Sequence, residues 1–495
     1  MFNLNLLLLI PLATLGGIVL IRDAGKARIV SAVGMSIQLI LTIWLWVAFA
    51  VERNAGNLAE VVFVQDYVWF NSLNIHYAIG VDGISVGMIV LTGVIIFSGV
   101  FASWTLKDLP KEFFIWLILL ATGVFGFFIS LDIFTMFLFF EIAVIPMYLL
   151  IGIWGTGNKE YAAMKLTLML MGASAILIVG ILGIYFNSSP EGNWTFNIIE
   201  ISKVDIPLSA QLFFFPFIFI GFGVISALFP FHTWSPDGHA SAPTAVSMLH
   251  AGVLMKLGGY GILKIGIYLL PRAASEMADF FLLFVGFGVI YGALAAVMQK
   301  DLKYINAYSS VSHVGLILFG LLMLTKTAAT GAVLQMISHG LITALFFALI
   351  GMIYSRTKTR IVEEMRGLLK VMPFLSAAYV IAGLASLGLP GFSGFIAEIT
   401  IFIGAFSHPE TYYRVLTIIA VTSIVVAAVY ILRVVGKMLM GELKDESYKE
   451  LADAAWHEKL AVITLIICIT ALGMAPYGMS ELIRAGLEPI MTRLF

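Results

Sequence analysis

Long apolar runs, separated by short polar stretches, follow one another along almost the whole chain. The runs are continuously apolar, without the alternation of a β-barrel strand, and most approach the roughly 20 residues that a membrane-spanning helix needs. The pattern predicts an all-α polytopic membrane protein, a single transmembrane domain over residues 1–495. We expect fourteen transmembrane helices, approximately at 3–21, 29–51, 84–103, 113–131, 133–154, 162–186, 211–230, 242–269, 279–298, 304–324, 329–354, 374–403, 411–440 and 459–477.

Lys and Arg residues are distributed unevenly between the predicted loops. The loops on the side of the N-terminus hold 7 of them and the opposite loops hold 19. Because cytoplasmic loops carry the excess of positive charge, both termini are expected on the non-cytoplasmic side of the inner (cytoplasmic) membrane. The first apolar run has no basic leader, so we expect a helix there rather than a secretory signal. The longest loops, 52–83 and 187–210, are expected to form short ordered caps.

The composition supports the membrane assignment and excludes several kinds of site. Hydrophobic residues make up 61% of the chain and charged residues 12%, well below the roughly 25% charged residues of soluble domains. The net charge of −1 gives no indication of nucleic-acid binding. With Cys468 as its one cysteine, the chain has no disulfide and no cysteine-ligated cluster of its own. No nucleotide-binding glycine motif is present, so neither a cofactor nor a metal is expected in this chain.

Ionisable residues interrupt three of the apolar runs. Glu141, Lys256 and Glu398 each lie deep in a predicted helix, where an ionisable group is costly and usually functional. Burial shifts glutamate and lysine toward proton exchange near neutral pH, so the pattern favours movement of protons or ions through a membrane. Asp132 lies near a helix start and is more typical of a cap. Lys264 lies toward a helix end, where snorkelling to the interface is an alternative to a functional role.

Proline and glycine predict breaks in two of the helices. The seventh helix runs into a segment with Pro230 and Pro236, and the twelfth contains the sequence LGLPGFSG at 387–394. Proline removes a backbone donor and clashes with the preceding turn, so both helices should bend or unwind. Breaks at corresponding places are typical of inverted repeats in transporters. Two inverted five-helix repeats are therefore expected, helices 4–8 over 113–269 and helices 9–13 over 279–440.

Several motifs resemble those of a known family. They are FFEIAVIPMY at 139–148, HTW at 232–234 with Pro236 and Asp237, the segment 239–256, AYSSVSHVG at 307–315, QMISHG at 335–340, and Leu389-Pro390-Gly391 followed by Glu398. Together these cover roughly residues 80–440. The chain resembles the antiporter-like subunits of respiratory complex I, the NADH:quinone oxidoreductase, and most of all the bacterial M-type (chain 4) members. Related subunits occur in membrane-bound hydrogenases, in multi-subunit cation/proton antiporters and in photosynthetic complex I.

The resemblance implies a proton relay, and the chain departs from the family pattern at one position. The relay positions are Glu141, Lys256, His313, His339 and Glu398, and secondary candidates are His232, His250 and Lys264. Histidine exchanges protons near neutral pH with little tuning, although a membrane histidine is often only an interhelical hydrogen-bond partner. The family usually has a lysine in helix seven, five residues before Pro230. That position is Ile225 here, so the glutamate–lysine pair expected at the entry half of the channel is incomplete.

The resemblance also implies a function and its partners. The expected function is outward proton translocation in the membrane arm of a redox-driven complex, with uptake from the cytoplasm and release near Glu398. NADH, FMN, iron–sulfur clusters and quinone would be held by partner subunits, and the neighbours would be L- and N-type subunits, small membrane subunits, the peripheral redox arm and lipids. The alternatives are a subunit of a cation/proton antiporter or hydrogenase-type complex and a non-pumping structural subunit. The sequence leaves open the electron donor and whether H⁺ or Na⁺ is moved.

Overall fold

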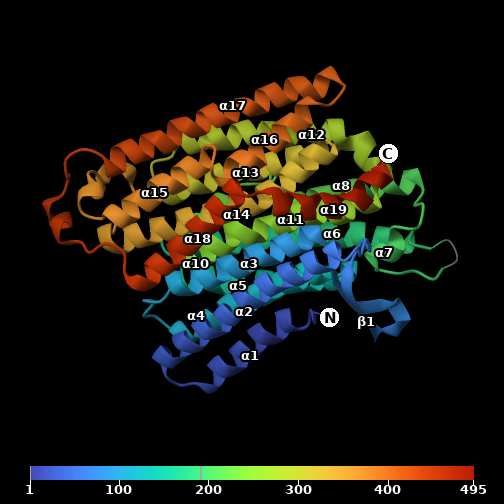
Figure 1. Cartoon of the computed structure of the whole chain (residues 1–495), viewed down its shortest axis with the longest axis horizontal. Helices are drawn as coiled ribbons and strands as arrows, with labels where there is room; N and C mark the ends of the chain where they lie inside the picture. Colours follow the sequence, from blue (N-terminus) through green and yellow to red (C-terminus); the bar gives the residue numbers. More distant parts are fainter. Residues whose placement is uncertain (1, 190–191, 495) are drawn as a thin grey trace.

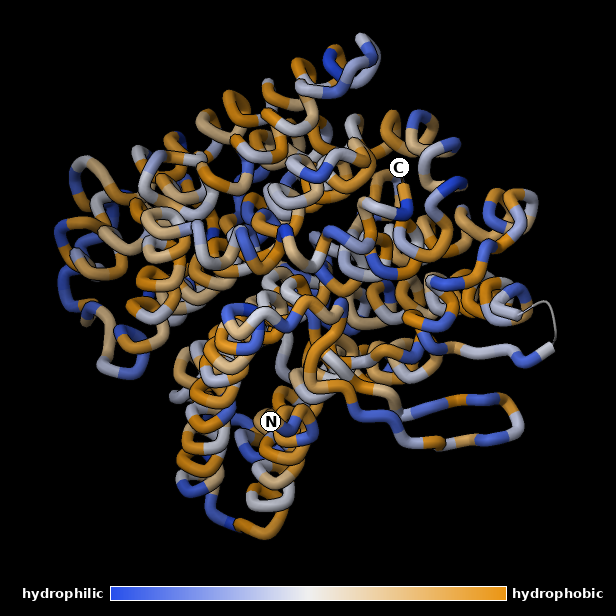
Figure 2. The backbone as a smooth tube through the Cα atoms, turned by 45° about the vertical axis from the view of Figure 1, so that its right-hand side comes forward, coloured by the Kyte–Doolittle hydropathy of each residue, from blue (hydrophilic) through white to orange (hydrophobic). Residues whose placement is uncertain are grey.

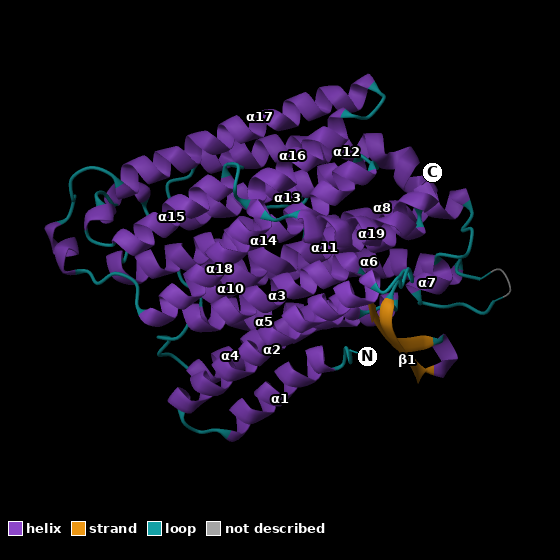
Figure 3. Ribbon diagram, viewed as in Figure 1, coloured by secondary structure: helices purple, strands orange, loops and turns teal. Residues whose placement is uncertain are grey.

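The computed structural model describes residues 2–189 and 192–494. In this part of the chain twelve helices are long and apolar enough to cross a membrane, and they run side by side (Figures 1 and 3). They are α2 (Ala24–Asn54), α3 (Gly83–Ala102), α4 (Pro110–Ile129), α5 (Ile133–Trp154), α6 (Lys159–Phe186), α8 (Leu208–Ile225), the run Thr244–Ile267, α12 (Pro271–Met298), α13 (Leu302–Leu322), α14 (Lys326–Thr357), α17 (Thr411–Val434, extended to Leu439) and α18 (Trp456–Met474). Figure 2 shows apolar residues along the helices and hydrophilic residues concentrated toward their ends and loops.

Shorter apolar helices account for the two remaining predicted segments. α1 (Leu6–Leu20) matches the first, and α15 (Pro373–Ser386) with α16 (Ser393–Phe406) matches the twelfth. The all-α polytopic architecture and the fourteen apolar segments expected from the sequence are thus confirmed for the described residues. The chain is a multi-pass membrane protein.

Both predicted helix breaks are present. α8 ends at Ile225, the chain turns, and a short helix α9 (Trp234–Ser241) follows. Between α15 and α16, Gly388 and Gly391 have φ angles of +64° and +100°, a left-handed region that glycine reaches at little cost. These breaks agree with the repeat hypothesis, and the boundaries of the two inverted repeats stay a prediction. The run Thr244–Ile267 is itself irregular, because π-helical stretches at His250–Leu254 and Ile262–Ile267 flank α11 (Met255–Gly261), while α10 (Thr244–Leu249) begins it.

Both chain ends lie at one end of the bundle, here called the terminal face, on the right in Figure 1. The antiparallel hairpin of β1 (Val62–Phe70) and β2 (Ile75–Val81) lies there, with Tyr67 opposite Tyr77. The short helix α7 (Ile198–Ile201) caps the same face. These elements are the ordered caps expected at 52–83 and 187–210, the first of them a two-stranded sheet. The other end of the bundle is called the opposite face.

The C-terminal helix α19 (Tyr477–Leu494) is not among the helices expected from the sequence. It continues from the end of α18 toward the terminal face and packs on α3 and α14. Its apolar side, including Leu482, Ile483 and Ile490, is buried, whereas its outer side carries Glu481 and Arg484. A search for continuous apolar runs misses this helix because its apolar residues form only a stripe.

Backbone contact between α19 and α3 depends on a glycine. A Cβ atom at Gly83 would collide with the carbonyl oxygen of Leu482, and Gly486 lies against Ile84. Gly83→Ala is therefore expected to push α19 away and to destabilise the fold by about 1–3 kcal/mol. The measurement is the thermal unfolding of the complex in detergent. Gly478→Ala in α19, where no atom lies within 4 Å of the added Cβ, is the control and should cost nothing; equal melting of both variants would contradict the packing argument.

Candidate functional site

Lys256 lies at the middle of the bundle, with 1% of its surface exposed. Its Nζ atom donates to the carbonyl oxygen of Ala251 and lies 2.8 Å from Nδ1 of His339 on α14. The π-helical stretch His250–Leu254 directly precedes α11, and such irregular turns are frequent at functional sites. The structure thus brings together two of the residues expected from the sequence.

The row continues through two more helices. The rings of His339 and His313 have centroids 5.3 Å apart. On α13, Nδ1 of His313 lies 3.4 Å from Oε1 of Glu398 and 3.3 Å from Nε2 of Gln335. Lys256, His339, His313 and Glu398, here called the central row, therefore form one series of titratable side chains drawn from α11, α14, α13 and α16.

The helix break next to α16 makes room for Glu398. A Cβ atom at Gly388 would lie 2.7 Å from a carboxylate oxygen of Glu398, so glycine is required at this approach. A small enclosed cavity of about 10 Å³ adjoins the carboxylate, lined in part by Ser312, Ser386 and Ser423. This volume is about that of a single water site, and the hydroxyl groups give such a water partners.

The three other central histidines gather around the break between α8 and α9. The rings of His239 and His250 are 4.1 Å apart, His250 lies 5.3 Å from the ring of Trp234, and His232 lies 4.9 Å from the ring of Tyr291. No hydrogen bond within the described chain joins His232 or His250 to the central row, and among the described residues neither ring nitrogen of His250 has a hydrogen-bond partner in the protein.

Glu141 lies apart from the central row. On α5 it is half-buried and accepts a hydrogen bond from the hydroxyl of Ser174 on α6. No lysine or arginine in residues 2–189 and 192–494 forms an ion pair with it. Ile225, at the position of the family lysine, is buried at the end of α8. The gap seen in the sequence is thus also a gap in the structure, and the relay role of Glu141 stays a prediction.

Two assignments made at the helix ends have different outcomes. Asp132 is the N-cap of α5 and accepts hydrogen bonds from the backbone nitrogens of Thr135, at 2.9 Å, and His76, at 3.1 Å, as expected for a cap. The alternative that Lys264 snorkels to the membrane interface is wrong. Its side chain is buried in an ion pair with Asp82, the N-cap of α3. A buried lysine beside a buried carboxylate has no need to reach the interface.

Sequence reasoning missed a group of charges nearer the opposite face. Lys303 is buried and donates to the carbonyl oxygen of Ala242 at 2.6 Å. Lys165 pairs with Asp237 at 2.7 Å, and the Tyr304 hydroxyl donates to the same carboxylate at 3.1 Å. Lys303 precedes an expected helix, at 304–324, and beside Asp301 it resembles an ordinary loop charge. Its burial depends on the fold, in which α13 packs against α9 and Nζ of Lys303 reaches the carbonyl that follows α9.

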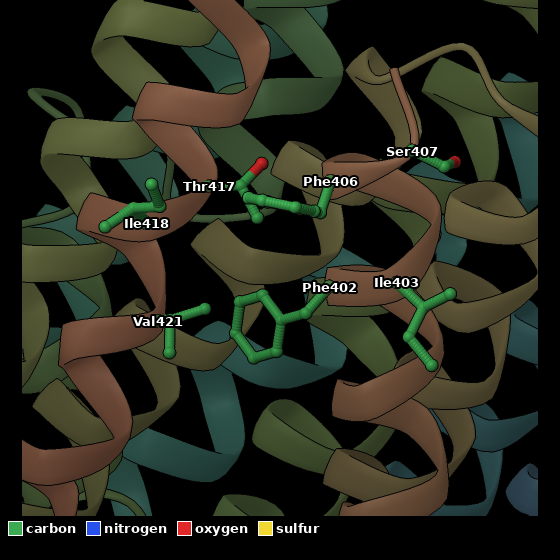
Figure 4. Close-up of a pocket in the computed structure, with 7 residues that line it drawn as sticks. All are labelled: Phe402, Ile403, Phe406, Ser407, Thr417, Ile418 and Val421. Carbon is green, nitrogen blue, oxygen red and sulfur yellow. The ribbon is translucent and has the colours of Figure 1, made fainter. Parts of the chain in front are cut away.

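An apolar groove on the surface is unrelated to the central row. It lies between α16 and α17, has a volume of about 580 Å³ and is lined by Phe402, Ile403, Phe406, Ser407, Thr417, Ile418 and Val421 (Figure 4). Two hydroxyl groups are the only polar side-chain groups of this lining. Such a surface fits hydrocarbon and offers no titratable group for proton transfer.

Comparison with known proteins agrees with this geometry. The family model described as NADH:quinone oxidoreductase/Mrp antiporter, transmembrane, matches residues 130–426. NADH-quinone oxidoreductase subunit M of Rickettsia prowazekii is 33% identical over 474 residues, covering 95% of this chain and 94% of that protein. An NAD(P)H-quinone oxidoreductase chain 4 of Picosynechococcus is 38% identical over 406 residues, 81% of this chain and 72% of that protein.

Solved structures share the fold over nearly the whole chain. A chain of respiratory complex I from Thermus thermophilus has a TM-score of 0.88 at 24% identity, covering 98% of this chain and 99% of that one. A chain of the Mrp complex from Dietzia has a TM-score of 0.86 at 19% identity, with coverages of 99% and 97%. Together with the matched motifs, these comparisons show that the chain belongs to the antiporter-like transmembrane family of NADH:quinone oxidoreductase and Mrp subunits, on its subunit M (chain 4) branch.

Proposed function

We propose that the chain is the M-type, proton-translocating subunit in the membrane arm of a redox-driven NADH:quinone oxidoreductase. The observation that carries the proposal is the central row. Its four titratable side chains run from the irregular helix of Lys256 to the broken helix of Glu398, at the depth where half-helices meet. Intramembrane ionisable groups arranged in series are typical of proton relays.

The chemistry of the row is proton exchange. The Lys256 ammonium gives a proton to Nδ1 of neutral His339 and becomes an amine. His339 passes a proton from Nε2 to His313 through one bridging water, and His313 transfers one from Nδ1 to the Glu398 carboxylate. Each step leaves its donor ready to accept again, and the same steps run in reverse. Moving one charge against 100 mV costs about 2.3 kcal/mol, which corresponds to a difference of roughly 1.7 pKa units between two sites.

The energy source lies outside this chain. Quinone reduction elsewhere in the complex changes the charge balance along the membrane arm and thereby the proton affinities of the row. NADH, FMN, iron–sulfur clusters and quinone belong to partner subunits, and the membrane neighbours are L- and N-type subunits and small subunits. The excess of Lys and Arg in the loops of the opposite face supports an orientation with this face in the cytoplasm and both termini outside. Glu141, held by Ser174, acts from α5 as a modulator.

Purification of the native complex tests the proposal. Mass spectrometry should find flavin and iron–sulfur subunits with this chain, and inverted membrane vesicles should take up protons when NADH is added, equally with and without Na⁺. Co-purification of small antiporter subunits, with Na⁺-dependent proton exchange in the absence of any reductant, would instead identify a cation/proton antiporter. A complex that pumps normally without the central row would identify a structural subunit.

A further inference from the structure

A second series of polar groups leads away from Lys256 along its own helix. Tyr260 follows one turn later, is buried, and interacts with Ser85 and Asp82 at the start of α3. Asp82 accepts hydrogen bonds from the backbone nitrogens of Ile84 and Ser85 with one carboxylate oxygen and pairs with Lys264 through the other. A turn of helix rises about 5.4 Å, so this series starts close to the central row and runs toward the terminal face.

The series continues to the surface through a tyrosine. Nζ of Lys264 lies 5.8 Å from the ring centroid of Tyr268, whose hydroxyl donates to Oε1 of Glu60 at 2.6 Å. The guanidinium of Arg493, on α19, lies 5.6 Å from the same ring. Tyr268 is 2% exposed, so it is the last fully buried member of the series.

Glu60 lines a charged depression at the terminal face. This cavity has a volume of about 620 Å³ and is lined by Arg53, Leu58, Ala59, Glu60, Lys326, Glu481, Arg484, Ala485, Glu488 and Pro489. Its wall on one side is α19, which packs by backbone contact over the start of α3. The depression is wide enough to be filled by water, so a proton that reaches Glu60 has reached solvent.

The surroundings of Glu398 differ on the two sides. Toward the terminal face, α16 presents Phe402 and Phe406 to the apolar groove of Figure 4. Toward the opposite face, the hydroxyls of Ser309 and Tyr430 lie 2.7 Å apart beside a cavity of about 20 Å³ that also touches Asn306. Ser309, Tyr430 and Asn306 thus offer polar groups on the opposite-face side of Glu398, whereas the groove on the terminal side offers only the hydroxyls of Ser407 and Thr417 among its lining side chains. This asymmetry favours the side away from the one where the sequence places release.

We infer that protons leave the central row for the terminal face through Tyr260, Asp82, Lys264, Tyr268 and Glu60, with Glu398 at the receiving end of the row. In this outlet Lys256 gives a proton to the Asp82 carboxylate by way of the Tyr260 hydroxyl. Asp82 then passes a proton to Lys264. At the same time the Lys264 ammonium gives a proton to Tyr268. Tyr268 takes that proton in exchange for the hydroxyl proton that it gives to Glu60, and Glu60 releases one proton to solvent. Asp82, Lys264, Tyr268 and Glu60 each return to their first state, and Lys256, left as an amine, takes its next proton from His339 in the central row. The inference rests on the proposed function.

The minimal tests are Tyr268→Phe, which removes one hydroxyl, and Glu60→Gln, which removes one titratable carboxylate. Each should lower NADH-driven proton output in inverted vesicles by about threefold or more, with unchanged amounts of assembled complex. Glu60→Asp should restore most of the output. The matched controls are Glu481→Gln, in the same depression, and the exposed Tyr477→Phe, both with wild-type output expected.

The outcome separates this inference from the proposed function. Wild-type output from Tyr268→Phe and Glu60→Gln, together with low output from Lys256→Met, would overturn the outlet and leave the proposed function standing. Normal output from Lys256→Met as well would overturn both. Loss of output in Glu60→Gln that Glu60→Asp does not restore would indicate a structural contact in place of an outlet.

Discussion

Lys256→Met is expected to lower redox-driven proton transport by about tenfold or more. Methionine matches the length of the lysine stem and removes the amine that hydrogen-bonds His339. In this variant the central row ends at His339, and no titratable side chain at position 256 exchanges a proton with it. Proton uptake by inverted vesicles, together with the rate of NADH oxidation in the presence of an uncoupler, measures the effect.

The loss should not come from unfolding. Replacing a buried charge with an apolar side chain of similar volume is often neutral or stabilising, so the variant complex should assemble and melt like the wild type. Lys370→Met is the control, because Lys370 is exposed at the end of the short 3-10 helix Leu368–Lys370, and proton uptake by this variant should be unchanged. Full transport in an assembled Lys256→Met complex would support the structural alternative.

The fold could be predicted well because its membrane-spanning helices are continuous apolar runs in the sequence. Each lipid-spanning segment must satisfy its own backbone hydrogen bonds, so a run such as α12 or α14 is visible in the sequence without any knowledge of its neighbours. α19 was missed because it is amphipathic and is stabilised by contact with α3. The β1–β2 hairpin was expected only as a cap, because its mixed residues give no continuous run.

The site was predictable only in part. Glu141, Lys256 and Glu398 are conspicuous because a charge in an apolar run is rare, and the motif resemblance added His313 and His339. Which of them touch depends on helix packing: Lys256 meets His339 across 83 residues of sequence, whereas the side-chain hydrogen bond of Glu141 within the described residues is with Ser174. The partner of Lys264 was hidden for the same reason, since Asp82 lies far away in the chain and looks like an ordinary helix cap.

Glu398→Gln is expected to reduce the number of protons moved per electron while leaving assembly intact. Glutamine keeps the size of the side chain and a polar contact with His313, now 3.4 Å from the carboxylate, but it cannot exchange a proton with that ring. Glu398→Asp is the matched variant, because it keeps the carboxyl and withdraws it by one methylene toward the backbone of α16, so it should retain part of the transport. Simultaneous recording of vesicle acidification and NADH oxidation gives the ratio. An unchanged ratio in Glu398→Gln would remove this residue from the relay, whereas a fall in Glu398→Gln with partial recovery in Glu398→Asp would show that its proton, and not its shape, is what the row requires.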